Sequence, residues 1–176
     1  MKHVYYDIES EHYLPTEGET VCIAVAKETE DGMTGTVLTR EDKSEKELID
    51  SFIDYLPSLN EEACIVTYNG DTFDWGFLVA RAMLFDDFGE TVDNLFNYKE
   101  ELDSHDLFKT HGQKDGSYLK LEELGKQNGV EHKVNCDGSL ISSLYDRGRW
   151  GLIKKYARED VRVTYKIYEK AVLDHS

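Results

Sequence analysis

The sequence contains few of the residues that build disulfide-rich, disordered or membrane-spanning proteins. Its 176 residues include three cysteines, Cys22, Cys64 and Cys136, without a C-x-x-C pair, so neither a disulfide framework nor a thiolate zinc site is predicted. Only two prolines occur and 40% of the residues are hydrophobic, which indicates an ordered globular protein. There is no apolar run of bilayer-spanning length and no signal-peptide pattern, so we expect a soluble, cytoplasmic protein without membrane contact.

Positive charge is also scarce. The chain has 20 lysine and arginine residues against 36 aspartate and glutamate residues, a formal net charge of -16 at pH 7. This balance argues against a protein that coats nucleic acid by bulk electrostatics, because such proteins usually carry a basic stripe. It does not exclude a metal-dependent nuclease, since bound divalent ions can supply positive charge where a phosphate approaches.

The hydrophobic pattern predicts an α/β fold in one domain, residues 1–176, with a mixed sheet of about five strands covered by helices. The predicted strands are Val4–Ser10, Thr20–Ala26 and Thr34–Arg40, which form an antiparallel meander, then Ala63–Tyr68 and a short edge strand, His105–Phe108. The predicted helices are Ser44–Pro57, Phe73–Gly89, Leu119–Asn128, Ser139–Tyr145 and Leu152–Leu173. Glu90–Asp103 has some helical character, and Gly112–Ser117 is expected to be a loop.

Two acids in the first strand point to metal chemistry. Alternate residues of a strand share a face, so Asp7 and Glu9 project from the same side of Val4–Ser10. Two neighbouring carboxylates in a half-buried strand repel each other unless a cation lies between them, and a hard divalent metal would serve. The alternative is an exposed edge strand that ends in acids.

A third acid, Asp74, follows the apolar strand at a turn that leads into a helix, in the stretch Asn69–Leu78 (NGDTFDWGFL). Ligands in open α/β sheets gather at such strand ends, so Asp74 could join the first pair of acids. The alternative is that Asp71, Thr72 or Asp74 only caps the helix.

A fourth acid lies in the last helix, where Tyr156 and Asp160 are four residues apart and therefore share the inward face. An acid on a buried face needs a partner. Either a basic residue, Lys2 or Arg81, neutralises Asp160, or Asp160 shares a metal with Asp7 and Glu9.

Taken together, D-x-E in the first strand, N-x-x-x-F-D at the turn and Y-x-x-x-D in the last helix resemble the three exonuclease motifs of the DEDD superfamily. The resemblance spans Tyr5 to Tyr168 and is greatest to the exonuclease domains of family-B DNA polymerases and their stand-alone relatives. Lys155 stands where the histidine branch of this superfamily has histidine, so the resemblance is to the tyrosine branch.

The resemblance implies a ribonuclease-H-like fold and two divalent ions, Mg²⁺ or Mn²⁺, with five catalytic residues. By analogy, Asp7 bridges both ions, Glu9 and Asp160 bind the ion that holds the nucleophile, Asp74 serves the second ion, and Tyr156 orients the attacking water. Carboxylates are the ligands that both metals prefer, and two such ions can promote an in-line displacement at phosphorus.

The implied activity is a 3′-5′ exonuclease that releases nucleoside 5′-monophosphates from single-stranded or frayed nucleic acid with a free 3′ end, DNA being favoured. The alternatives are a ribonuclease-H-like endonuclease and a non-catalytic nucleic-acid-binding module of the same fold. No polymerase domain follows in this sequence, so we expect an exonuclease that acts alone or with a protein partner from replication or repair.

Substrate contacts are expected at three places. The second motif contributes Asn69 and Phe73, and the loop after the first strand offers Tyr13 and Leu14, either as a wedge against the terminal base or as a plug for the core. A basic, aromatic-interleaved stretch offers contacts to phosphate or, alternatively, forms a solvated helix face; its members include Arg147, Arg149 and Lys155.

Overall fold

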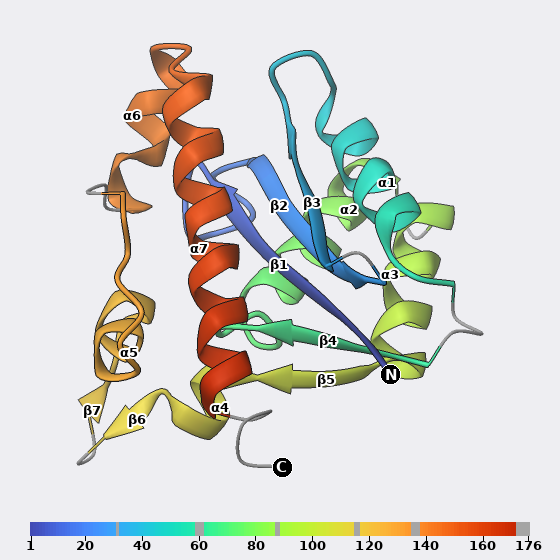
Figure 1. Cartoon of the computed structure of the whole chain (residues 1–176). Coiled ribbons are helices and arrows are strands. Elements are labelled where there is room, and N and C mark those ends of the chain that lie inside the picture. The colour runs from blue at the N-terminus through green and yellow to red at the C-terminus, as the bar shows by residue number, and fades with distance from the viewer. Residues whose placement is uncertain (31, 59–61, 87–88, 115–116, 135–137, 172–176) are drawn as a thin grey trace.

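A five-stranded sheet forms the centre of the protein (Figure 1). The computed structural model describes residues 1–30, 32–58, 62–86, 89–114, 117–134 and 138–171. The strand order is β3-β2-β1-β4-β5. The strands are β1 (Lys2–Ser10), β2 (Thr20–Thr29), β3 (Gly32–Thr39), β4 (Ala63–Thr67) and β5 (Asp103–Asp106).

The pairing of these strands confirms the predicted ribonuclease-H-like sheet. Strands β1, β2 and β3 form the expected antiparallel meander, whereas β4 pairs in parallel with β1, and β5 in parallel with β4. The carboxyl ends of β1, β4 and β5 therefore lie at the same edge of the sheet. Near that edge the β1–β2 register shifts between Glu9 and Ser10, an irregularity of the kind often found beside active sites.

Helices cover both faces of the sheet, so that α1, α2 and α3 lie on one side and α7 crosses the other (Figure 1). The helices are α1 (Glu45–Tyr55), α2 (Asp74–Asp86), α3 (Glu90–Glu101), α4 (Leu107–His111), α5 (Leu121–Gln127), α6 (Ile141–Asp146) and α7 (Trp150–Ala171), and a 3₁₀ turn, η1 (Gly138–Leu140), precedes α6. Within the described ranges, no helix combines the length and apolar character needed to cross a bilayer.

The alternation of β1 divides the core into two layers. Val4, Tyr6 and Ile8 pack against α1, α2 and α3, whereas Tyr5 packs against α7. Because successive side chains of a strand point to opposite faces, Asp7 and Glu9 lie on the same side as Tyr5, below α7. The pattern of one strand thus places both acids on the face that the last helix covers.

Two predictions about the polar middle of the chain were wrong. The edge strand ends at Asp106 rather than Phe108, because the Asp106 carboxylate accepts the Phe108 N–H at 3.0 Å and caps α4 there. The expected loop Gly112–Ser117 contains a short strand, β6 (Gln113–Lys114), and ends in the first residue of a second one, β7 (Ser117–Tyr118), which pairs with β6. Cys136 and the predicted end of the last helix at Leu173 lie outside the described residues.

Candidate functional site

Three of the predicted metal ligands meet beneath α7. One carboxylate oxygen from each of Asp7, Glu9 and Asp160 lies within 4.8 Å of the others. Glu9 and Asp160 are buried and Asp7 is partly buried. A cluster of three acids in so little water is costly without a cation, because burial removes solvation from charges that also repel one another.

The side chain of Asp7 fits a metal ion in a further way. Its Oδ2 atom is buried and has no hydrogen-bond partner among the described residues. Burial raises the pKa of Asp7 well above its ordinary value, and the charges of Glu9, Asp160 and Asp74 raise it further. Burial raises the pKa of Glu9 in the same way. An ion that binds oxygen would both satisfy the Asp7 oxygen and offset this repulsion, so the donor set suits a hard divalent cation.

The fourth predicted ligand, Asp74, lies beside this cluster as the first residue of α2. Its Oδ1 atom accepts the Ile8 N–H at 3.0 Å, so this buried carboxylate joins the helix start to β1. Burial raises the pKa of Asp74 to about 7, although the Ile8 N–H and its own backbone N–H favour the ionised form. Asp74 therefore lies close enough for its charge to act on Asp7, but it is not part of the described cluster of three carboxylates.

Asp106, which sequence reasoning did not select, holds the turn that positions Asp74. Its carboxylate accepts the N–H of Asn69 at 2.7 Å and the N–H of Asp71 at 3.3 Å. Asn69 has a φ of 65°, in the left-handed region that asparagine tolerates. At Gly70, a Cβ atom would lie 2.5 Å from the Thr67 side chain. The turn thus depends on a buried acid from the end of the neighbouring strand.

The partner of Asp160 is neither of the two basic residues that the sequence suggested. Arg81 pairs with Glu45, while the His132 Nε2 lies 2.5 Å from Asp160 Oδ1. The His132 side chain is only 7% exposed. His132 lies in the irregular segment before η1. No sequence pattern there distinguishes a histidine that pairs with a buried acid from any other polar loop residue. The partner of Asp160 was therefore missed.

The contacts of the two ring nitrogens of His132 show where its hydrogens lie. Nδ1 is 2.8 Å from the carbonyl oxygen of Val134, and a carbonyl only accepts, so Nδ1 carries hydrogen. The hydrogen bond to Asp160 raises the pKa of His132, which favours a proton on Nε2 as well. Burial raises the pKa of Asp160, whereas His132 and Tyr156 lower it. His132 thus holds the Asp160 carboxylate through a charge-assisted hydrogen bond.

Tyr156 lies one helical turn before Asp160 on the same face of α7, and the two side chains interact. Burial, followed by the negative charges of Asp160, Glu9 and Asp7, raises the pKa of the Tyr156 hydroxyl above its ordinary value. The hydroxyl is therefore neutral near pH 7. It can orient a neighbouring molecule by hydrogen bonding, but it does not readily lose its proton. Its ring lies 5.7 Å from that of His132, centroid to centroid.

A hollow of about 370 Å³ opens next to Glu9 and contains two of the predicted substrate contacts, Tyr13 and Phe73. Its other lining residues are Ile8, Ser10, Glu11, His12, Gly138, Ser139 and Ser142. The hollow therefore lies between the β1–β2 loop and the η1–α6 segment. Tyr13 is 67% exposed, so its ring is available for contact rather than plugging the core.

The remaining predicted contacts do not line this hollow in the described part of the chain. Leu14 lies at the loop surface and Asn69 takes part in the turn before α2. The three basic candidates are all exposed, on or next to the ends of α6 and α7: Arg147, Arg149 and Lys155. Their position agrees with the expectation of a solvated surface as well as with contact to phosphate.

A family comparison identifies the kinship of the chain. Residues 11–175 match the family described as "Predicted 3'-5' exonuclease related to the exonuclease domain of PolB". The chain belongs to this family. The matched range contains Asp74, Tyr156 and Asp160, while Asp7 and Glu9 precede it. The predicted kinship with family-B polymerase exonucleases is thereby confirmed.

Relatives of this PolB-related exonuclease domain include archaeal polymerases. DNA polymerase 2 of Aeropyrum pernix is 26% identical over 156 residues, which cover 76% of this chain and 18% of that protein. A DNA polymerase of Methanocaldococcus jannaschii is 33% identical over 135 residues, covering 76% of this chain and 6% of that protein. The chain thus corresponds to a small part of these polymerases.

Solved structures share the fold of the domain. The family B DNA polymerase of Pyrobaculum calidifontis aligns with a TM-score of 0.77 and 22% identity, over 98% of this chain and 24% of that one. Exonuclease I of E. coli in complex with a dA16 oligonucleotide aligns with a TM-score of 0.55 and 17% identity, over 98% of this chain and 42% of that one. These likenesses confirm the ribonuclease-H-like fold.

His132→Ala is expected to weaken the binding of Mn²⁺ to the metal-free protein by about tenfold, because Asp160 loses the hydrogen bond that orients it. Titration calorimetry with Mn²⁺ measures this change without any substrate. His111→Ala, on α4, is the matched control and should bind Mn²⁺ like the wild type. Equal or tighter binding by His132→Ala would mean that the imidazolium competes with the ion instead of orienting its ligand.

Proposed function

We propose that this chain is a metal-dependent 3′-5′ exonuclease of the tyrosine branch, which hydrolyses single-stranded or frayed DNA to nucleoside 5′-monophosphates. The observation that carries the proposal is the cluster of Asp7, Glu9 and Asp160, in which a buried oxygen of Asp7 has no hydrogen-bond partner among the described residues. Membership in the PolB-related family supports the direction of cleavage. DNA is favoured because the relatives are DNA polymerases and exonuclease I has been solved with DNA oligonucleotides.

In the proposed site, four acids would hold two divalent ions: Asp7 would be shared by both ions, Glu9 and Asp160 would bind the first, and Asp74 would serve the second. Two such ions, Mg²⁺ or Mn²⁺, would act as Lewis acids that stabilise the entering and leaving oxygens of the displacement at phosphorus. The protein supplies the geometry: β1 fixes two ligands, α7 fixes the third, and His132 orients that third ligand.

Hydrolysis breaks the bond between phosphorus and the 3′ oxygen of the preceding nucleotide. The oxygen of the attacking water joins the released 5′-phosphate, and a proton ends on the 3′ oxygen of the shortened strand. Because the pKa of Tyr156 is raised, its neutral hydroxyl is suited to orient the water by a hydrogen bond rather than to remove a proton from it. Because water attacks phosphorus directly, no covalent intermediate with the protein is formed.

The hollow beside Glu9 is the proposed place for the 3′-terminal nucleotide. Aromatic side chains bind bases of any sequence by stacking, and Tyr13 and Phe73 line this hollow from the β1–β2 loop and from the turn before α2. Leu14 and Asn69 extend the proposed contacts from the loop and the turn, and the exposed cations Arg147, Arg149 and Lys155 would meet more distant phosphates. A replication or repair protein remains the proposed partner.

End-labelled single-stranded DNA should be shortened stepwise from its 3′ end when Mn²⁺ is present, and not in excess chelator. Labelled RNA of the same sequence should be degraded more slowly. Chromatography of the products should identify nucleoside 5′-monophosphates, since the phosphate leaves with the terminal nucleotide. A circular single strand is the matched control and should survive, because it offers no 3′ end.

Two outcomes would contradict this function. Cutting of the circular strand would identify a ribonuclease-H-like endonuclease instead. Binding of the labelled strands without any Mn²⁺- or Mg²⁺-dependent cleavage would identify a non-catalytic nucleic-acid-binding module.

A further inference from the structure

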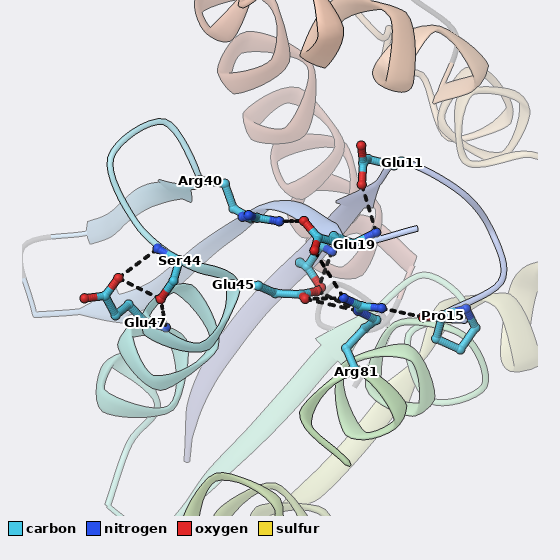
Figure 2. Close-up of polar contacts among 9 residues, drawn as sticks. Glu11, Pro15, Glu19, Arg40, Ser44, Glu45, Glu47 and Arg81 are labelled. Atoms are coloured by element: carbon cyan, nitrogen blue, oxygen red, sulfur yellow. Dashed lines mark hydrogen bonds and ion pairs between the residues drawn. The ribbon is translucent and has the colours of Figure 1, made fainter. Parts of the chain in front are cut away.

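The loop that joins β1 to β2 is fastened to the helical layer by Arg81. This arginine lies on α2 with its side chain 12% exposed, and Glu45, its partner on α1, is 6% exposed. The guanidinium donates from Nε to Glu45 Oε1 at 2.9 Å and from Nη2 to Glu45 Oε2 at 2.5 Å, so the two planar groups pair as forks (Figure 2).

The same guanidinium reaches the loop itself. Its Nη1 donates to the carbonyl oxygen of Pro15 at 2.7 Å, and Nη2 lies 3.6 Å from Oε1 of Glu19 (Figure 2). Glu45 adds a contact just beyond the loop, because its Oε1 accepts the N–H of Thr20 at 2.6 Å. One buried ion pair therefore holds both the middle and the end of the loop.

The loop is also closed on itself, so holding Pro15 also restrains its neighbours. The N–H of Glu11 donates to the carbonyl oxygen of Glu19 at 3.0 Å, and the N–H of Glu19 donates back to the Glu11 carboxylate at 3.1 Å. Between these ends, the carbonyl oxygen of Leu14 accepts the N–H groups of Glu17 and Gly18 at 3.0 and 3.2 Å. Arg81 thus fastens a loop with its own internal structure.

This loop forms one wall of the hollow beside the acidic cluster. Glu11, His12 and Tyr13 line it together with Glu9. Arg81 is seven residues after Asp74 on α2, close to two full helical turns, so both residues lie on the same side of that helix. A single helix therefore carries an acid of the proposed metal site and the anchor of the loop.

We propose that Arg81 is a positioning residue for substrate: it fixes the β1–β2 loop at the distance from Glu9 at which the hollow accepts the 3′-terminal nucleotide. This inference rests on the proposed function. Among the described residues, Arg81 contacts neither the four proposed metal ligands nor the lining of the hollow, so it acts through the loop. Lysine could not replace it, because a single ammonium cannot pair with a carboxylate as a fork while also donating to the Pro15 carbonyl.

The position of the loop can be tested without substrate or metal by hydrogen–deuterium exchange. In Arg81→Met, amide exchange in residues 11–19 should rise by about tenfold or more, and in Arg81→Lys by less, while peptides from β1 and α7 keep wild-type exchange. Lys46→Met is the matched control, because Lys46 follows Glu45 on α1 but forms an exposed ion pair with Asp50. Unchanged exchange in the loop of Arg81→Met would overturn the proposal.

The effect on substrate is tested with the same variants by steady-state cleavage of single-stranded DNA. Arg81→Met should raise KM by about tenfold and change kcat by less than about threefold, because the loop is displaced while the acids are not. Arg81→Lys keeps the charge and should be closer to the wild type in stability. Its KM should lie between those of the wild type and Arg81→Met. Adding Tyr13→Ala to Arg81→Met should have little further effect, since both changes remove the same contact.

The two proposals fail in different ways. If the wild type does not cleave, the proposed function fails, and fluorescence anisotropy with the same labelled strand then decides the role of Arg81. Binding that is about tenfold weaker in Arg81→Met supports positioning of nucleic acid by the loop. Faster amide exchange in the loop of Arg81→Met, together with an unchanged KM or unchanged binding by anisotropy, would overturn the proposal. Arg81 would then stabilise the loop without serving the substrate.

Discussion

Replacing Asp7 with alanine is expected to lower the rate of cleavage by more than about 10³-fold, because Asp7 is the proposed ligand shared by both ions. The variant should remain folded. In the wild type, the Oδ2 atom of Asp7 makes no hydrogen bond with the described residues, and the Asp7 charge repels Glu9, Asp160 and Asp74. The free energy of unfolding of the metal-free protein should therefore be equal to or higher than that of the wild type. Single-turnover cleavage and denaturant unfolding measure the two effects.

Thermal unfolding with Mn²⁺ separates loss of metal from loss of fold. An ion that binds only the native state raises its melting temperature, so millimolar Mn²⁺ should stabilise the wild type and stabilise Asp7→Ala much less. Asp103→Ala, an exposed acid on β5, is the matched control and should respond to Mn²⁺ like the wild type. Substantial cleavage by Asp7→Ala, or equal shifts in both proteins, would place the ions elsewhere.

Replacing Tyr156 with phenylalanine is expected to slow the chemical step by about 10²-fold or less, with metal binding nearly unchanged. The hydroxyl is proposed to orient the water, and this role requires no contact with an ion. The ring should keep its packing against the core beneath α7 and beside His132. Positioning of the nucleophile is one contribution among several, which is why the loss should be smaller than for Asp7→Ala.

Single-turnover cleavage at saturating Mn²⁺, together with a calorimetric Mn²⁺ titration, distinguishes these roles. Asp160→Ala serves as the comparison, because it should weaken metal binding directly. If Tyr156→Phe weakened metal binding as much as Asp160→Ala, or cleaved at the wild-type rate, Tyr156 would not be the residue that orients the water.

Local patterns determined much of the fold and of the candidate site. The alternation of β1 placed Asp7 and Glu9 on one face, and helical spacing placed Tyr156 beside Asp160 on the inward side of α7. These inferences need only the geometry of one strand and one helix. The capping box of Ser44 and Glu47 likewise fixed the start of α1, because both of its hydrogen bonds are local.

Other features depend on contacts between distant segments. β5 is short and polar, with no apolar alternation to mark its ends, and its range is set by pairing with β4. The partner of Asp160 is 28 residues away in an irregular segment, and the Ile8 N–H bound by Asp74 is 66 residues away. No periodicity encodes such distances.

The buried charges show the same division between sequence and tertiary structure. The sequence alone established that an inward-facing Asp160 requires a partner, because an isolated buried charge is costly. It offered Lys2 or Arg81 as this partner, and a metal shared with Asp7 and Glu9 as the alternative. Only tertiary packing decided that Arg81 pairs with Glu45 and donates to the Pro15 carbonyl, 36 and 66 residues away, and that His132 pairs with Asp160. Residue types define which charges need partners, and the arrangement of the strands and helices selects the partners within reach.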